Sequence, residues 1–340
     1  MQKINLLGFT LEQLKFEFLK NGLSILDAKR VFPWIHTKLA ASFSVMTDIP
    51  LEIRKILEHA YSLARPRCLT LQKSRDGTSK ALLEMVDGNL IETVLIPEER
   101  RTTVCVSTQI GCAMGCKFCH TGTQSFVRNL TSSEMISQIF FWKAERAVTN
   151  VVFMGMGEPL LNFENLSSVL ELLLDEKAHN FSRNKITVST SGITDDTIKS
   201  LAKFGVKLAI SLHAPTDEKR SFLMPINKKY NIKMLLETAR TYPQNSNTDC
   251  VTFEYLLLKD VNDADSDALA LACLLKSVPC KVNLIAFNNW PGTKFASSTE
   301  GRRNEFVRIA SNGIRVTARK SKGGDILAAC GQLKGASNLL

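Results

Sequence analysis

The 340-residue chain lacks long apolar runs, internal repeats and low-complexity tracts. Its first residues, MQKINLLGFTLEQLKFEF, contain no uninterrupted apolar segment, and no later stretch approaches the roughly 18 apolar residues that span a bilayer. We therefore expect a cytoplasmic globular protein, with no membrane partner, whose nine cysteines are reduced. The absence of repeats and biased tracts argues against a solenoid and against disordered tails.

Acidic residues are outnumbered, because 33 Asp and Glu face 43 Lys and Arg, which leaves a formal charge of +10. This balance favours a polyanionic partner such as nucleic acid. The excess is concentrated in residues 301–325, GRRNEFVRIASNGIRVTARKSKGGD. A solvated charged face is the competing interpretation of this stretch. Its basic residues are Arg302, Arg303, Arg308, Arg315, Arg319, Lys320 and Lys322.

Two patterns divide the chain before residue 101. Over residues 9–63 apolar side chains recur at helical spacing, as in LEQLKFEFLKNG and IRKILEHAYSLA, which predicts a small helical N-terminal domain over residues 1–66. Residues 67–100 contain two apolar runs joined by Asp87 and Gly88. Because glycine tolerates a positive φ, this pair is typical of a tight turn, and we expect a β-hairpin linker or extension there.

From residue 101 to 340, short β-branched runs alternate with helical stretches, which predicts parallel strands and an α/β domain. Nearly every run is followed at once by glycine or polar residues. Such residues at the ends of many successive strands favour an α/β barrel over a doubly wound sheet, which gathers its site at one switch point. The runs are TVCVST, NVVFMG, KITVST, KLAISL, VTFEYLLL, KVNLIAF and IRVTA.

Residues 111–119, GCAMGCKFC, place Cys112, Cys116 and Cys119 close together. Disulfides explain the pattern poorly, because three is an odd number and the last two cysteines are too near in sequence to brace much chain. A C-x3-C-x2-C triplet can hold three irons of a [4Fe–4S] cube and leave the fourth iron open for chemistry. Two alternatives remain open, a zinc site completed by His120 or Cys105, and cysteines that fill the core.

The triplet, with an aromatic residue before its last cysteine, resembles the motif of the radical S-adenosylmethionine (radical SAM) superfamily. Further motifs are similar, in order, to those of the dual-specificity 23S rRNA and tRNA adenine carbon-2 methyltransferases. The resemblance runs from about residue 4 to residue 335 and implies a partial (β/α) TIM-like barrel. The motifs are CVSTQIGCAMGCKFC, VVFMGMGEPLLN, TVSTSG, AISLHAP, MPINKKYNI, KVNLIAFN and DILAACGQL.

The resemblance implies one [4Fe–4S] cluster per chain, held by Cys112, Cys116 and Cys119, and two SAM molecules per turnover. It assigns the SAM amino group to Gly157 and Glu158, which suits a carboxylate facing an ammonium group. Taken singly, the residues assigned to the rest of SAM are also typical of ordinary turn and structural positions. They are Ser189, Ser211, Leu212, His213 and Asn288.

The resemblance also implies roles for two further cysteines, because an aromatic carbon of adenine is too weak a nucleophile to take the SAM methyl group directly. Cys330 would first receive a methyl group from SAM, and this group would then supply the carbon added to the base. Cys105 would resolve the enzyme–RNA link through a transient disulfide with Cys330. Glu92 would assist the accompanying proton transfer. The other cysteines lack such motifs and are expected in the core: Cys68, Cys250, Cys273 and Cys280.

The implied substrates are the peptidyl-transferase loop of 23S rRNA, as protein-poor precursor, and the anticodon loop of some tRNAs, where extruding a base costs least. The N-terminal domain would handle RNA, a flavodoxin-type donor would supply electrons, and the enzyme would act as a monomer. Two rival functions remain. One is the related antibiotic-resistance enzyme that methylates carbon 8 of the same adenine, and the other is a non-catalytic iron–sulfur protein that binds RNA.

Overall fold

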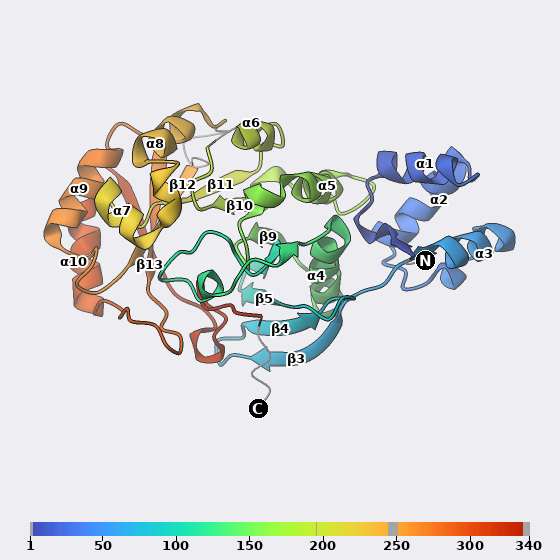
Figure 1. Cartoon of the computed structure of the whole chain (residues 1–340), viewed down its shortest axis with the longest axis horizontal. Coiled ribbons are helices and arrows are strands. Elements are labelled where there is room, and N and C mark those ends of the chain that lie inside the picture. The colour runs from blue at the N-terminus through green and yellow to red at the C-terminus, as the bar shows by residue number, and fades with distance from the viewer. Residues whose placement is uncertain (1–2, 195, 244–250, 336–340) are drawn as a thin grey trace.

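The computed structural model describes residues 3–194, 196–243 and 251–335 (Figure 1). None of the helices in these ranges combines the length and the apolar character needed to cross a lipid bilayer. The helices are α1 Leu11–Lys20, α2 Ile25–His36, α3 Leu51–Ala60, α4 Ser132–Glu145, α5 Phe163–Leu174, α6 Asp196–Ala202, α7 Asp217–Leu223, α8 Ile232–Thr241, α9 Asp265–Leu275 and α10 Glu300–Ala310. The strands are β1 Ile4–Asn5, β2 Tyr61–Ser62, β3 Arg67–Lys73, β4 Ser79–Glu84, β5 Leu90–Glu98, β6 Arg101–Cys105, β7 Gln109–Ile110, β8 Arg128–Asn129, β9 Asn150–Phe153, β10 Ile186–Thr190, β11 Lys207–Ser211, β12 Val251–Leu257, β13 Cys280–Ala286 and β14 Arg315–Arg319.

Helices α1, α2 and α3 form a small N-terminal unit at one end of the molecule (Figure 1). Thr10 and Ser24 begin α1 and α2 with capping boxes, in which each side chain accepts a backbone N–H of the first turn. The turn before α1 docks on α4, where Gly8 N donates to Ser133 Oγ over 2.9 Å. A Cβ atom on Gly8 would lie 2.2 Å from Ser133 N, so only glycine permits this close contact.

A ten-stranded sheet forms the centre of the molecule, in the order β14-β13-β12-β11-β10-β9-β6-β5-β4-β3. The neighbours from β6 through β9 to β14 pair in parallel, and those from β3 to β6 pair antiparallel. The parallel strands follow chain order without a reversal, which is the winding of a barrel and not of a doubly wound sheet. The predicted α/β barrel-type fold with a small helical N-terminal unit is therefore confirmed.

The parallel strands fill the core with β-branched and aromatic side chains. Strands buried on both faces are nearly continuous in apolar residues, which explains the apolar runs of the sequence. Side chains without exposed surface include Val104, Val151, Val188, Ile210 and Phe253.

The hairpin predicted around Asp87 and Gly88 joins β4 to β5, and Gly88 has the positive φ of 79° that its turn requires. Strand β3 pairs with β4 on the other side, so residues 67–98 add three antiparallel strands to the central sheet. The domain limits 1–66, 67–100 and 101–340 stay predictions.

The C-terminal segment, residues 323–335, crosses the opening between the edge strands β14 and β3. Gly323 N donates to Asp76 Oδ2 over 2.9 Å, in the turn between β3 and β4. This crossing places Cys330 beside the carboxyl ends of the parallel strands β9 and β13. The route of the last described residues therefore determines what faces the centre of the open barrel.

Candidate active site

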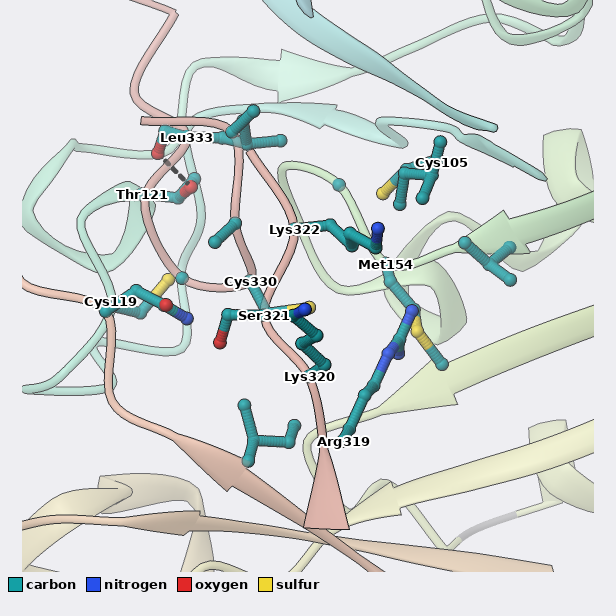
Figure 2. Close-up of a pocket in the computed structure, with 18 residues that line it drawn as sticks. Cys105, Cys119, Thr121, Met154, Arg319, Lys320, Ser321, Lys322, Cys330 and Leu333 are labelled. Carbon is teal, nitrogen blue, oxygen red and sulfur yellow. Dashed lines mark hydrogen bonds between the residues drawn. The ribbon is translucent and has the colours of Figure 1, made fainter. Parts of the chain in front are cut away.

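Two adjoining cavities lie at the carboxyl ends of the parallel strands. All of the predicted site residues are described, and only Leu212 and Glu92 line neither cavity. The cluster cavity is lined by Cys112, Cys116, Gly157, Glu158, Ser189, Ser191, Ser211 and His213. The thiol cavity, shown in Figure 2, is lined by Cys105, Asn288, Lys320, Ser321 and Lys322. Residues shared by both are Cys119, Arg319 and Cys330.

The cysteine loop, residues 111–122, is shaped by its glycines and its own backbone. Gly122 packs on Cys116, where a Cβ atom on the glycine would lie 2.6 Å from the Cys116 carbonyl oxygen. Cys119 N donates to the same oxygen over 3.1 Å. These contacts fold the loop so that all three thiols reach the wall of the cluster cavity.

The three thiols fit an iron–sulfur cluster. Burial raises the pKa of Cys112 to about 12 and that of Cys116 well above its usual value, so the free thiols keep their protons until a metal displaces them. Backbone N–H groups of Met114 and Gly122 donate to the sulfurs of Cys112 and Cys119. Within the described ranges, no three His, Cys, Asp or Glu side chains converge on one ion. Each thiol of a cluster binds a different iron, so three thiols on one cavity wall suit the cube without converging on a single point.

Glu158 presents a buried carboxylate to the cluster cavity. Ser191 N donates to Oε2 over 2.7 Å and Leu160 N donates to Oε1 over 3.2 Å, while burial raises the carboxyl pKa. No ion pair between described residues includes Glu158, so the carboxylate is available to the ammonium group of SAM. Gly157, with a φ of 94°, passes so close to Gln109 that a Cβ atom would lie 2.5 Å from its side chain.

The loops after β10 and β11 add polar groups to the same wall. The buried Ser191 side chain interacts with the Glu158 carboxylate and lines the same cavity. His213, with a φ of 56°, accepts a bond from Leu256 N at Nδ1 over 3.0 Å, so Nε2 carries the ring proton. Burial lowers the His213 pKa to about 3 and keeps the ring neutral. The side chain of Leu212 lies in the core, which leaves only its backbone near the cavity.

Cys105 and Cys330 come from the first strand and the last segment of the barrel and line the same cavity (Figure 2). Cys105 is 8% exposed, and burial raises its pKa to about 12. Cys330 is open to solvent within the cavity. The surrounding protein raises the Cys330 pKa, and the Arg319 cation opposes this rise. Figure 2 shows the Arg319 side chain extending from the end of β14 toward the two cysteines.

Hydrogen bonds fix the C-terminal segment against the cysteine loop. His120 N donates to Gly331 O over 2.7 Å, and Thr121 Oγ1 donates to Leu333 O over 2.6 Å, the bond drawn in Figure 2. The His120 ring, considered above as a zinc ligand, instead stacks on Trp290 with centroids 4.6 Å apart. These contacts hold Cys330 beside the cysteine loop.

Glu92 lies outside both cavities, in a buried ion pair with Lys80 whose oxygen and nitrogen are 2.8 Å apart. Its other oxygen accepts Lys334 N over 2.8 Å, and Lys80 Nζ donates to Leu327 O over 3.2 Å. The pair therefore holds the C-terminal segment on both sides of Cys330. Both oxygens of Glu92 are occupied, so a role in proton transfer requires this segment to move.

Glu254 belongs to the cluster cavity although no sequence motif singled it out. It lies in β12, it accepts Asn283 Nδ2 over 2.7 Å, and burial raises its pKa to about 7. Its one signal in the sequence is a lone carboxylate within the apolar run VTFEYLLL. Arg319 was visible only as one member of a basic stretch, because nothing local shows that it lines both cavities.

The basic stretch 301–325 divides into two parts. On α10 the arginines are paired with neighbouring acids, as expected of a solvated face. Lys320 and Lys322, beyond β14, instead line the thiol cavity, where positive charge faces the space that a substrate would enter. The pairs on α10 are Arg302 with Asp265, Arg303 with Glu300 and Arg308 with Glu305.

The prediction that the remaining cysteines lie in the core was wrong for Cys273, whereas Cys68 and Cys280 pack against the core. Cys273 is exposed, because it lies on the outer face of α9, and Cys68 and Cys280 are half-buried. Cys250 lies outside the described residues.

Two family models match the chain, and they cover different parts of it. The model described as "Radical SAM superfamily" matches residues 106–272. The model described as "Ribosomal RNA large subunit methyltransferase N-terminal domain" matches residues 4–63.

Named relatives match nearly the whole chain. "Dual-specificity RNA methyltransferase RlmN" of Francisella tularensis subsp. mediasiatica is 45% identical over 98% of this chain and 93% of its own length. The protein of the same name from Cereibacter sphaeroides (strain ATCC 17029) is 41% identical over 98% of this chain and 90% of its own length. The crystal structure of a radical SAM methyltransferase from Sphaerobacter thermophilus superposes with a TM-score of 0.90 at 41% identity, over 98% of this chain and 100% of that one.

Proposed function

The chain belongs to the RlmN family of dual-specificity RNA methyltransferases in the radical SAM superfamily, and from this membership we propose that it methylates carbon 2 of adenine in RNA. The substrates that we infer are one adenine in the peptidyl-transferase loop of 23S rRNA and one in the anticodon loop of some tRNAs. Membership in the superfamily implies a [4Fe–4S] cluster and SAM as cofactors, which the donor set of the cluster cavity fits.

One observation supports the methylation chemistry most directly. Cys105 and Cys330 line a single cavity, and Cys119 of the cysteine loop lines it with them. A protein that only bound RNA would have no need of two free thiols beside the loop. Because carbon 2 of adenine is a weak nucleophile, a thiol that carries the methyl group splits one hard step into easier ones.

Different residues of the chain have separate roles in the first half of the reaction. When bound, the cluster and SAM supply a methyl group and the means to remove a hydrogen atom from it. Glu158 binds the amino group of SAM through its buried carboxylate. Cys330 receives the methyl group on its sulfur, and the neighbouring Arg319 cation favours the thiolate that this transfer needs. After it has lost one hydrogen atom, the S-methyl carbon of Cys330 forms a bond to carbon 2 of the base. The adduct would then lose the carbon-2 proton and give up one electron to the oxidised cluster.

Cys105 releases the product in the second half. Its thiolate attacks the Cys330 sulfur, so that an S–S bond forms while the S–C bond to the base breaks. The electron pair of the broken bond stays on the carbon, which takes up a proton and becomes the methyl group. Glu92 assists proton transfer at carbon 2 after the C-terminal segment has released it.

The partners follow from charge and from the need to extrude a base. Lys320 and Lys322 attract RNA phosphates to the thiol cavity, and a flipped adenine reaches Cys330. Residues 1–66 handle the RNA, the rRNA substrate is protein-poor precursor, and a flavodoxin-type protein donates electrons. The enzyme acts as a monomer in the cytoplasm.

Mass spectrometry of nucleosides tests this function. The anaerobically reconstituted protein is incubated with SAM, a reductant, and rRNA or tRNA from cells that lack the enzyme. 2-Methyladenosine is expected in both RNAs. 8-Methyladenosine would assign the protein to the carbon-8 chemistry, and neither product, with an intact cluster, would overturn the proposed substrate.

A further inference from the structure

Arg220, in the short helix α7, has no exposed surface, and its guanidinium forms no ion pair with a carboxylate of the described residues. Its guanidinium donates five hydrogen bonds, and every acceptor is a neutral oxygen. A buried charge normally pairs with an opposite charge, because removal from water is costly. The acceptors are Leu212 O at 3.2 Å, Asn227 Oδ1 at 2.7 Å, Tyr230 O at 3.2 Å, Ser191 O at 2.6 Å and Ser211 O at 2.9 Å.

The position of Arg220 connects it to the cluster cavity. Ser191 and Ser211, whose carbonyls bind its Nη2, both line that cavity. Gly192 packs against Nη2 so closely that a Cβ atom on the glycine would lie 2.8 Å away. The guanidinium therefore lies directly behind the cavity wall.

The cysteine loop contacts α7 from the other side. Lys117 N donates to Leu223 O over 3.0 Å, which fixes the loop to the end of the helix that carries Arg220. The two groups whose negative charge would attract Arg220 are the sulfur of Cys116, once it is a thiolate, and the carboxylate of Asp217. The Asp217 carboxylate already accepts hydrogen bonds from Asn227 Nδ2 and Ile232 N, each over 2.9 Å.

We propose that Arg220 is a positioning residue whose buried charge is balanced by the thiolate-ligated cluster and favours one-electron reduction of that cluster. The inference rests on the proposed function only because it requires the cluster to be present. Three thiolates give the cluster a net negative charge that grows by one on reduction, so a fixed cation nearby stabilises the reduced state more. Three of the five bonds also hold Ser191, just after β10, and Ser211 and Leu212, at the end of β11.

A redox titration of the anaerobically reconstituted protein, followed by electron paramagnetic resonance without RNA, tests the proposal. For Arg220→Gln we expect about a tenfold loss in the equilibrium constant for reduction, a shift of about 59 mV to more negative potential. Asn227→Ala is the matched control, since it removes one hydrogen bond of Arg220 and keeps the charge. It should melt at a lower temperature and keep the wild-type potential.

Equal potentials for the wild type and Arg220→Gln, at equal iron content, would overturn the proposal, as would an equal shift in Asn227→Ala. If Arg220→Gln does not fold or does not retain iron, Arg220→Lys decides, because lysine keeps the charge and loses the planar fork. The cluster of Arg220→Lys should have the wild-type reduction potential. A more negative potential in this variant would refute the charge effect. The titration contains no RNA, so the measured potential does not depend on whether the protein methylates RNA.

Discussion

Cys112, Cys116 and Cys119 lie in one short loop, whereas Cys330 reaches the same cavity from the far end of the chain. The loop is shaped by its own glycines and backbone bonds. The C-terminal segment is held by partners remote in sequence, such as Thr121, whose hydroxyl donates to Leu333 O over 2.6 Å. The loop is thus mainly a local structure, with Lys117 N bound to Leu223 O of α7, and the segment is a tertiary one.

The difference fits two demands on the same site. A cluster needs ligands in a fixed arrangement, which a short constrained loop supplies. A methyl carrier must meet first SAM and then RNA, which suits a segment held by a few contacts that can open at less than the cost of global unfolding. We therefore expect changes in the segment to leave iron binding intact, and changes in the wall of the cluster cavity to act on SAM.

The largest effect is expected from Cys330→Ala. RNA methylation should fall below detection, because the thiol that carries the methyl group is gone, while iron content should equal that of the wild type. Iron analysis and nucleoside mass spectrometry measure the two. Cys273→Ala, at an exposed position on α9, is the control and should methylate normally. Any methyladenosine formed by Cys330→Ala would remove the proposed mechanism.

Cys105→Ala should stop the reaction one step later. The methyl carbon should join adenine, but without the second thiol the link to Cys330 should persist. A denaturing gel of the reaction with labelled RNA should show RNA attached to protein, at no more than one RNA per chain. Repeated turnover by this variant would show that Cys105 does not resolve the link.

Lys80→Met tests whether the ion pair of Lys80 and Glu92 keeps the C-terminal segment in place. Breaking a buried ion pair typically costs about 3–5 kcal/mol of unfolding free energy, and hydrogen exchange at residues 331–335 should rise while iron content stays unchanged. Denaturant unfolding and exchange mass spectrometry measure these effects. Lys73→Met, at an exposed position on β3, is the control. Unchanged exchange at the segment would contradict the role assigned to the pair of Lys80 and Glu92.

Glu158→Gln should have the smallest effect of the four and should act on SAM alone. Losing a charge-assisted bond of about 1.5–3 kcal/mol weakens SAM binding to the reconstituted protein by roughly 10- to 150-fold. Equilibrium binding of labelled SAM measures this change. Glu164→Gln, exposed at the start of α5, should bind SAM normally. Unaltered affinity in Glu158→Gln would assign the SAM amino group to another residue.

The fold class was predictable because strand and helix periodicities are local, and because glycine and polar residues follow each strand. Ser191 and Arg220 were not predictable. The first resembles any residue at the end of a strand, and the second resembles any charged residue on a helix. Only the packing of α7 against the cavity wall shows that its arginine is buried and forms no ion pair among the described residues. The basic stretch was partly predictable. Its charge and the two ion pairs within α10 are visible in the sequence, whereas the pairing of Arg302 with Asp265 of α9 is not.

The sequence by itself determined the features that depend on neighbours along the chain, namely the cysteine loop, the glycine turns and the order of strands and helices. The tertiary structure alone decided which distant groups meet, such as Cys105 with Cys330, and Lys80 with Glu92. The physical reason is that these meetings depend on where the C-terminal segment crosses the open sheet. That path is set by hydrogen bonds and burial shared among residues that no local pattern relates.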